Sequence, residues 1–158
     1  MTGEDFARKV TDLTPVMYRV CYMQLSSAAD RDDAVQDAIL KAWQKRHTLR
    51  NEEFFKTWLI RILINVCHDI QKSQKRCQPV ENVPEPAPNY NTRTEELRYA
   101  LAAIDEKYRM PVLLHYIDGF SIREVSQMLG ITENAVKLRL LRGRRKLREQ
   151  LSEEVFEK

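Results

Sequence analysis

The residues best suited to a chemical task are a run of cationic side chains near the end of the chain. Seven residues between positions 137 and 148 are basic and none is acidic: Lys137, Arg139, Arg142, Arg144, Arg145, Lys146 and Arg148. At about 100° per residue, one side of a helix here is apolar or small and holds Val136, Leu140, Gly143 and Leu147. Cationic groups on the other faces suit the phosphates and base edges of DNA. The alternative interpretation is a solvated basic face.

The helix that carries this basic run begins near Glu133, and its first turns hold the side chains that a recognition helix directs at base edges in a major groove. These residues are Glu133, Asn134, Lys137 and Leu138. Leu138 and Leu141 lie off the apolar stripe and are candidates for contact with thymine methyl groups.

A second polar surface is predicted on a long helix at residues 53–76. The side nearly opposite its apolar stripe carries five polar or basic residues, which we call the polar ridge: Arg61, Asn65, His68, Lys72 and Arg76. For a generic protein, a solvated face is the better explanation of such a ridge. Asn65 favours a functional role, because asparagine is a poor mid-helix residue and a good reader of base edges.

The sequence lacks the patterns typical of an enzyme. His47, His68 and His115 have neither nucleophile nor metal-ligand spacing, and there is no Gly-rich phosphate loop, HExxH or CxxC. The three cysteines also lack metal spacing. We therefore expect no enzyme activity, no cofactor, no metal and no small-molecule substrate.

The basic segment is preceded by the signals of a helix-turn-helix. Ser121 and Glu124 form a capping box at the start of a short helix. Gly130 stands where a left-handed C-cap is needed, and Thr132 can cap the second helix. The coincidence of these signals with a one-sided basic helix predicts DNA binding.

Three helices are predicted in an N-terminal module, residues 1–76. The first spans 3–25 and should kink or split at Pro15. The second spans 30–45, and its core side holds Val35, Ala38, Ile39, Ala42 and Trp43. Its other face carries a polar, acidic patch with no nearby partner in sequence: Asp33, Gln36 and Asp37. The third is the ridge helix.

Residues 77–94 contain four prolines and too few apolar side chains for a core, which predicts an extended linker. A second module follows at 95–152, with a tail at 153–158. It should contain a helix at 95–104 and a turn from Asp105 to Tyr108. We expect Pro111 in the first turn of the next helix, followed by inward-facing Val112, Leu113, Tyr116 and Ile117.

Glycine at position 143 costs roughly 1 kcal/mol of helix propensity. Close approach of the basic helix to the first helix of the pair would compensate for this cost. With four glycines and few β-branched runs, the fold class is all-α: two small helical modules joined by a Pro-rich linker.

Composition limits the setting of the protein. The chain has 158 residues and a net charge of +3, so nucleic-acid binding depends on where the charge lies. No signal peptide is evident, and no apolar run approaches the ~20 residues of a membrane span. We expect a cytoplasmic protein with reduced thiols.

The two modules together resemble the RNA polymerase sigma factors of the extracytoplasmic-function (ECF) group. The stretches DAVQDAILKAW (33–43) and FFKTWLIRILINVCHDIQKSQKR (54–76) are similar to the second conserved region of that family. Its R-I-x-x-N signature falls on Arg61, Ile62 and Asn65. The stretch at 101–147 is similar to the fourth conserved region, so the resemblance covers nearly the whole chain.

The resemblance implies roles for the N-terminal surfaces. The patch of Asp33, Gln36 and Asp37 would dock on the clamp helices of the largest polymerase subunit. The polar ridge would face the minus-ten promoter element. A pocket for a flipped base would be formed by Leu49, Arg50, Asn51 and Glu52, and Trp58 would either stack on an unpaired base or remain a half-buried core residue.

For the C-terminal module, the resemblance implies recognition of the minus-thirty-five element and docking on the polymerase flap. The residues expected at this DNA are Thr132, Glu133, Asn134, Lys137, Leu138, Arg139, Leu141, Arg142, Arg144 and Arg145. The implied partners are core RNA polymerase, promoter DNA and an anti-sigma factor, which in this group is often in the membrane. The alternative is a stand-alone helix-turn-helix regulator whose N-terminal module dimerises or senses a signal.

Overall fold

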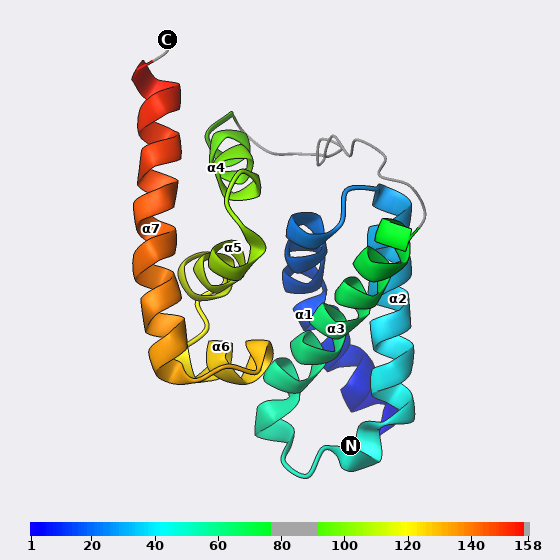
Figure 1. The fold of residues 1–158 in the computed structure, drawn as a ribbon. Helices are drawn as coiled ribbons and strands as arrows, with labels where there is room; N and C mark the ends of the chain where they lie inside the picture. Colours follow the sequence, from blue (N-terminus) through cyan, green and yellow to red (C-terminus); the bar gives the residue numbers. More distant parts are fainter. Residues whose placement is uncertain (77–91, 157–158) are drawn as a thin grey trace. The chain divides into compact units, whose positions relative to one another are not determined.

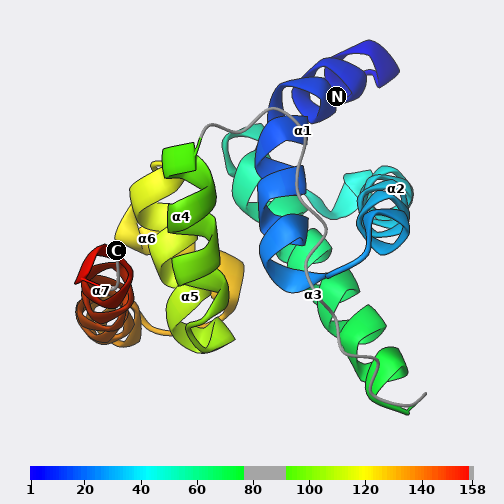
Figure 2. The ribbon, with the colours of Figure 1, turned by 90° about the horizontal axis from the view of Figure 1, so that it is seen from above.

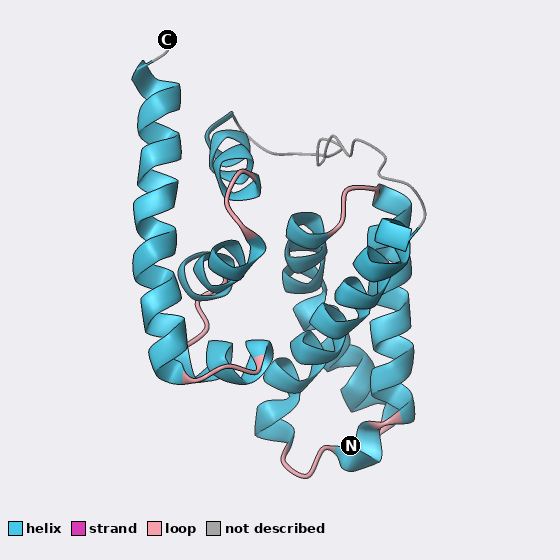
Figure 3. Ribbon diagram, viewed as in Figure 1, coloured by secondary structure: helices cyan, strands magenta, loops and turns pink. Residues whose placement is uncertain are grey.

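The computed structural model describes the backbone of residues 1–76 and 92–156 and the side chains of residues 1–74 and 96–151. Within these ranges the regular elements are all helical, and Figure 3 shows only helices and loops. The helical fold class predicted from the sequence is confirmed. The chain forms two units, one built on α1, α2 and α3 and the other on α4, α5, α7 and most of α6 (Figure 1).

Helix α1 (Gly3–Gln24) begins at an N-cap formed by Thr2, whose hydroxyl accepts a hydrogen bond from the Asp5 amide. It continues through Pro15 as one element. Of the kink or split predicted at Pro15, the split therefore does not occur. The buried side chains of the helix recur at helical spacing, from Phe6 to Val20, and packing of this stripe offsets the backbone hydrogen bond that proline cannot donate.

Helix α2 (Ala28–Gln44) starts two residues earlier than predicted, because Ser27 caps it by accepting from the Asp30 amide. Val35, Ala38 and Ala42 are buried as expected. Trp43 is 37 % exposed and Ile39 is only partly buried, so their prediction as core residues is wrong. Their side of α2 borders α1 at the surface instead of facing the interior.

Two short 3-10 turns, η1 (Arg46–Thr48) and η2 (Glu52–Phe54), lead into α3 (Phe55–Arg76). Helices α1, α2 and α3 pack against one another, as Figure 2 shows from above. The buried face of α3 includes Phe55, Leu59, Leu63 and Val66, as the apolar spacing predicts. This packing fixes the orientation of the helix that carries the polar ridge.

Two cysteines meet in the core of the first unit. Cys21 on α1 and Cys67 on α3 are fully buried free thiols whose sulfur atoms lie 3.8 Å apart. The contact with Cys67 and burial together raise the pKa of the Cys21 thiol. The pair behaves as a small apolar contact between helices.

The second unit begins with α4 (Thr92–Ala102), so residues 92–94 are helical rather than part of the linker. Helix α5 (Glu106–Val112) starts where a turn was predicted, and Pro111 lies inside it rather than in its first turn. A π-helical segment, η3 (Leu113–Ile117), continues it, and there the Asp118 amide donates to the Leu113 carbonyl at 3.0 Å.

The irregular turn also changes which side chains face inward. Leu113 and Leu114 are buried, but Tyr116 and Ile117 are 48 % and 40 % exposed. The prediction that the latter two pack inward is wrong, because a segment with π-helical hydrogen bonds rotates side chains away from 3.6-residue periodicity.

Helices α6 (Ile122–Leu129) and α7 (Glu133–Phe156) form the helix-turn-helix. The predicted capping box is confirmed: the Ser121 hydroxyl accepts from the Glu124 amide at 3.1 Å, and the Glu124 carboxylate accepts from the Ser121 amide at 3.0 Å. Gly130 is left-handed at φ 68°, and Thr132 accepts from the Ala135 amide. Helix α7 extends into the predicted tail.

Gly143 is buried, but its neighbour is not the one predicted. A Cβ at this position would lie 2.7 Å from Val112 Cγ2 and 3.1 Å from the Tyr108 carbonyl oxygen. The close approach is therefore between α7 and α5, not between the two helices of the helix-turn-helix. Absence of a side chain at position 143 lets α7 settle directly on α5.

Replacing Gly143 by alanine is expected to lower the free energy of unfolding by about 1 kcal/mol. The helix propensity of alanine favours the variant by about 1 kcal/mol, and overpacking against Val112 costs about 1–3 kcal/mol. Chemical denaturation measures the difference. If the clash with Val112 is the cause, Val112→Ala will lower the free energy of unfolding less in the Gly143→Ala variant than in the parent. A Gly143→Ala protein that is more stable than the parent would contradict the prediction.

The linker predicted at 77–94 lies outside the described residues except for its last three positions, and the side chain of Arg76 lies outside them too. Among the helices that are described, none has the length and hydropathy needed to cross a bilayer.

Candidate nucleic-acid interface

The polar ridge lies on the side of α3 away from the core of the first unit. Arg61, Asn65 and Lys72 are exposed, and His68 is partly buried. Leu59, Leu63 and Val66, on the opposite side, are 0–3 % exposed. A helix held on one side by close packing presents its outer side chains in a fixed order, which is the requirement for tracking a nucleic-acid strand.

The loop before α3 is held at its C-terminal end, next to η2. Asn51 accepts a hydrogen bond from the Glu53 amide through its side-chain oxygen at 3.0 Å, which caps η2. Glu52 lies 3.4 Å from the Lys9 ammonium on α1 and 3.4 Å from the amine of Met1. The contact with Lys9 and the Met1 amine lowers the pKa of the Glu52 carboxyl, so this group is ionised at neutral pH. Arg50, which directly precedes these anchored residues, is exposed.

Trp58 lies at the start of the ridge helix and is partly buried. Its ring packs on Phe55 at 5.9 Å between centroids, with the planes tilted by 49°. Phe55 in turn contacts Phe6 edge-on at 5.8 Å. This position is compatible with both roles predicted for Trp58, because part of the ring contacts the core and part is open to solvent.

The outer side of α7 gathers the residues predicted to meet the minus-thirty-five element. Val136 and Leu140 are buried against the rest of the second unit. The predicted DNA-facing side chains are exposed apart from Arg139, which is partly buried: Thr132, Glu133, Asn134, Lys137, Leu138, Leu141, Arg142, Arg144 and Arg145. Leu138 and Leu141 are 45 % and 48 % exposed, which is consistent with apolar contact to a ligand and not with a core role.

Aromatic rings on α5 and η3 orient several of these cations. Arg144 lies over the Tyr116 ring at 5.8 Å, and Lys146 lies over the Tyr108 ring at 5.2 Å. Burial acts to raise the pKa of Tyr108, but the neighbouring Lys107 and Arg142 cations outweigh it and lower that pKa. The exposed Tyr116, which the sequence placed in the core, positions a basic residue instead.

The predicted polymerase-binding patch lies on the outside of α2. Asp33 and Gln36 are exposed, and Asp37 is partly buried. The sequence suggested no partner for this patch, but Asp37 forms an i, i+4 ion pair with Lys41 at 3.3 Å. An exposed pair of this kind is worth about 0.3–0.5 kcal/mol, so Asp37 remains available to a stronger cationic partner.

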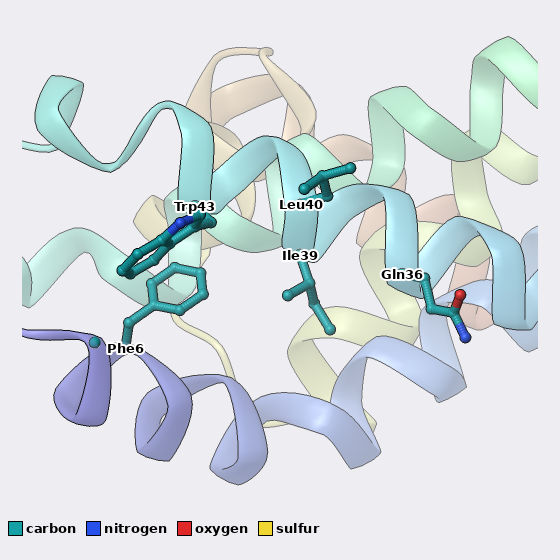
Figure 4. Close-up of a pocket in the computed structure, with 6 residues that line it drawn as sticks. Phe6, Gln36, Ile39, Leu40 and Trp43 are labelled. Carbon is teal, nitrogen blue, oxygen red and sulfur yellow. The ribbon is translucent and has the colours of Figure 1, made fainter.

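An apolar groove adjoins this patch, between α1 and α2 (Figure 4). It encloses about 420 Å³ and is lined by Gly3, Phe6, Gln36, Ile39, Leu40 and Trp43. The rings of Phe6 and Trp43 meet at 5.1 Å with an interplanar angle of 63°. Leu40 is 54 % exposed. Gln36 belongs to both the groove and the acidic patch, so the two form one continuous surface.

Sequence reasoning missed Leu40 and misplaced Trp43. A signal was present, because Gln36, Leu40 and Trp43 recur at helical spacing on the face of α2 that also carries Asp33. An apolar residue on an otherwise polar helix face indicates a contact surface.

No group of three or more His, Cys, Asp or Glu side chains suited to a metal ion occurs within the part of the chain that the structure describes. What the surfaces offer is binding: exposed cations, amides and apolar side chains on rigid helices.

Comparison with known proteins accounts for both units. The family described as Sigma-70 region 2 matches residues 10–77, and Sigma-70 region 4 matches residues 94–147. The ECF RNA polymerase sigma factor SigM of Mycobacterium tuberculosis is 31% identical over 139 residues, which cover 83% of this chain and 69% of SigM. The chain belongs to the ECF RNA polymerase sigma factors.

A second relative is similar over more of its length. RNA polymerase sigma factor SigV of Bacillus subtilis is 26% identical over 149 residues, with 92% of this chain and 90% of SigV covered. The predicted resemblance to sigma factors is confirmed. This ECF sigma factor directs RNA polymerase to promoter DNA. A stand-alone regulator is not favoured, because the region 2 match explains the N-terminal unit.

Solved structures share the fold. The sigma factor RpoE from Bartonella quintana, in complex with the anti-sigma factor NepR, superimposes with a TM-score of 0.83 at 24% identity, over 94% of this chain and 98% of RpoE. CnrH, in complex with the cytosolic domain of CnrY, gives 0.75 at 24% identity, over 96% and 90%.

Proposed function

We propose that this ECF sigma factor contacts the promoter at two places, with the polar ridge of α3 at the minus-ten element and the outer face of α7 at the minus-thirty-five element. The observation that carries this assignment is that each unit presents exposed cationic and amide side chains on one rigid helix, opposite its own core. On α7, the early residues read bases, while Thr132, Arg144 and Arg145 bind phosphates.

At the minus-ten element, the loop of Arg50, Asn51 and Glu52 receives a base that leaves the stack, and Trp58 stacks beside it. Flipping a base costs a few kcal/mol, which a fitting pocket recovers for the right base only. The ridge residues Arg61, Asn65, His68, Lys72 and Arg76 follow the strand that becomes single. The protein's part is binding and positioning, and the chemistry belongs to the polymerase.

Core polymerase docks on α2 through the largest-subunit clamp helices. Asp33 and Asp37 attract basic side chains of the polymerase, which raises the association rate and fixes the register of the two surfaces. The adjoining groove at Leu40 and Trp43 takes an apolar side chain from the same partner, and burial of apolar area supplies affinity. The second unit docks on the polymerase flap.

Each unit alone binds DNA weakly, since its positive charge is confined to one helix face. When polymerase holds the two units at the spacing of the promoter elements, the second contact becomes intramolecular and benefits from a high effective concentration. Free protein should therefore bind promoter DNA poorly, and a gel shift that shows tight specific binding without polymerase would contradict this mechanism.

The relatives RpoE and CnrH were solved with NepR, an anti-sigma factor, and with the cytosolic domain of CnrY. We propose that an anti-sigma factor is a third partner of this chain. It would hold the sigma factor inactive until the sigma factor is released. The sigma factor acts in the cytoplasm, where polymerase and promoter DNA are. It is retained at the membrane when its anti-sigma factor is membrane-bound.

In vitro transcription tests the proposal. Purified protein is mixed with core RNA polymerase that lacks any sigma factor and with DNA from upstream of the protein's own gene. Specific initiation locates both promoter elements. If the protein neither binds the core enzyme nor initiates on this DNA or a genomic library, the proposed assignment fails.

Truncation of Leu40 to alanine is expected to weaken binding to core polymerase about tenfold, because an apolar side chain at the edge of an interface contributes about 1–2 kcal/mol. Since Leu40 is 54 % exposed, the variant should fold normally. Fluorescence titration with core polymerase measures the change, and exposed Ser73→Ala on α3, away from the groove, is the control. Equal affinities for the two variants would place the docking surface elsewhere.

A further inference from the structure

The loop that precedes α3 is joined to α1 by an ion pair between residues far apart in sequence. The Lys9 ammonium lies 3.4 Å from Oε2 of Glu52. The Lys9 side chain is 26 % exposed, against 53 % for Glu52. The same ammonium lies 5.6 Å from the centroid of the Phe55 ring, at the first residue of α3. Lys9 therefore contacts both the end of the loop and the start of the ridge helix.

These contacts constrain the residues that would hold a flipped base. Glu52 follows Asn51 directly, and Asn51 caps η2 by accepting from the Glu53 amide. A further bond within the turn runs from the Phe54 amide to the Asn51 carbonyl at 3.1 Å. These bonds make the segment from Asn51 to Phe54 one local unit, and the ion pairs of Glu52 with Lys9 and with the Met1 amine set where that unit lies on the helical body.

We propose that Lys9 is a positioning residue for promoter opening: it anchors Glu52 on α1 and thereby holds Arg50 and Asn51 at the start of the ridge helix. This inference rests on the proposed minus-ten role of the loop. The residues of the loop then have different roles. Glu52 fixes the loop to the body, and Arg50 and Asn51 meet the base.

The pair is suited to adjusting position rather than to stabilising the fold. A partly exposed ion pair contributes little to global stability, so its loss leaves the three-helix body folded. Geometry is more sensitive, because a pocket that recognises a base must be held to within about half an ångström by its supporting contacts.

The experiment uses the polymerase holoenzyme assembled with four forms of the full chain: parent, Lys9→Glu, the charge-swapped Lys9→Glu/Glu52→Lys, and Arg8→Glu. Arg8 is the matched control, since it lies next to Lys9 on α1 and pairs with exposed Asp5 at 3.2 Å. Its reversal changes the net charge by the same amount. Opening is followed by permanganate reactivity of minus-ten thymines, on the matched promoter and on one with an altered minus-ten element.

We expect Lys9→Glu to slow opening of the matched promoter about three- to tenfold, because an attractive contact becomes a repulsive one. The preference for the matched over the altered element should fall with it. The charge swap should restore both quantities only in part, because the reversed pair attracts again while the reversed charge at position 52 repels the Met1 amine. Arg8→Glu should leave the preference unchanged, and all four free proteins should unfold at similar temperatures.

Three results would overturn the proposal. The first is a preference for the matched minus-ten element that is equal in Lys9→Glu and Arg8→Glu. The others are a charge swap that restores neither the opening rate nor this preference, and a fall in the unfolding temperature of Lys9→Glu large enough to account for its slower opening. The proposed function can be judged separately. If Arg50→Ala and Asn65→Ala leave opening unchanged, the minus-ten assignment itself fails. If those variants impair opening and Lys9→Glu does not, only the positioning role fails.

Discussion

Replacing Asn65 by alanine is expected to slow promoter opening about 10- to 100-fold while leaving the affinity for core polymerase unchanged. An amide that forms two hydrogen bonds with a base edge contributes about 1–3 kcal/mol of discrimination. Asn65 is exposed in the middle of the polar ridge, one turn after Arg61, and takes no part in the core of the first unit. Its loss should therefore affect DNA and not the fold.

Permanganate reactivity of the minus-ten thymines measures opening, and a polymerase titration measures docking. Ser73→Ala serves as the control, because Ser73 is exposed on the same helix but off the ridge. Unchanged permanganate reactivity in the Asn65 variant would reject the assignment. A parallel loss of polymerase affinity would show that Asn65 acts in docking instead.

Arg142→Ala is expected to weaken recognition of the minus-thirty-five element by about 1–3 kcal/mol if the guanidinium reads a guanine. Arg142 is exposed on the outer face of α7. The holoenzyme's affinity for promoters with matched and scrambled minus-thirty-five elements is the measurement.

The comparison of the two promoters separates base reading from phosphate contact. A base reader loses affinity mainly on the matched element, whereas a phosphate contact loses it equally on both and lowers the salt dependence. Arg148→Ala is the matched control, with the same side chain exposed further along α7. Equal losses for Arg142→Ala on both elements would reduce Arg142 to a phosphate contact.

The sequence by itself determined the features that depend on local interactions. The capping box of Ser121 and Glu124 and the left-handed Gly130 could be predicted because each involves residues within one turn of the chain. The polar ridge could be predicted because a helix of known period places Arg61, Asn65 and Lys72 on one side whatever packs on the other.

Periodicity was less reliable where the backbone departs from a regular helix. The 3.6-residue spacing predicts Tyr116 and Ile117 in the core, but they lie in a π-helical segment and are exposed. Proline at position 15 predicts a kink or a split of α1, and the split does not occur, because apolar contacts along the whole helix keep it continuous. In both cases the competing interaction involves more than one turn of chain.

Only the tertiary structure decided which helices meet and which side chains they share. A glycine at position 143 predicts a close approach between helices, and the approaching helix is α5 at Val112. The groove at Leu40 and Trp43 depends on Phe6 from another helix, and the anchor of the minus-ten loop depends on Lys9, distant in sequence from Glu52. Periodicity gives the direction of a side chain from its own helix axis, but contacts between helices depend on how the helices pack.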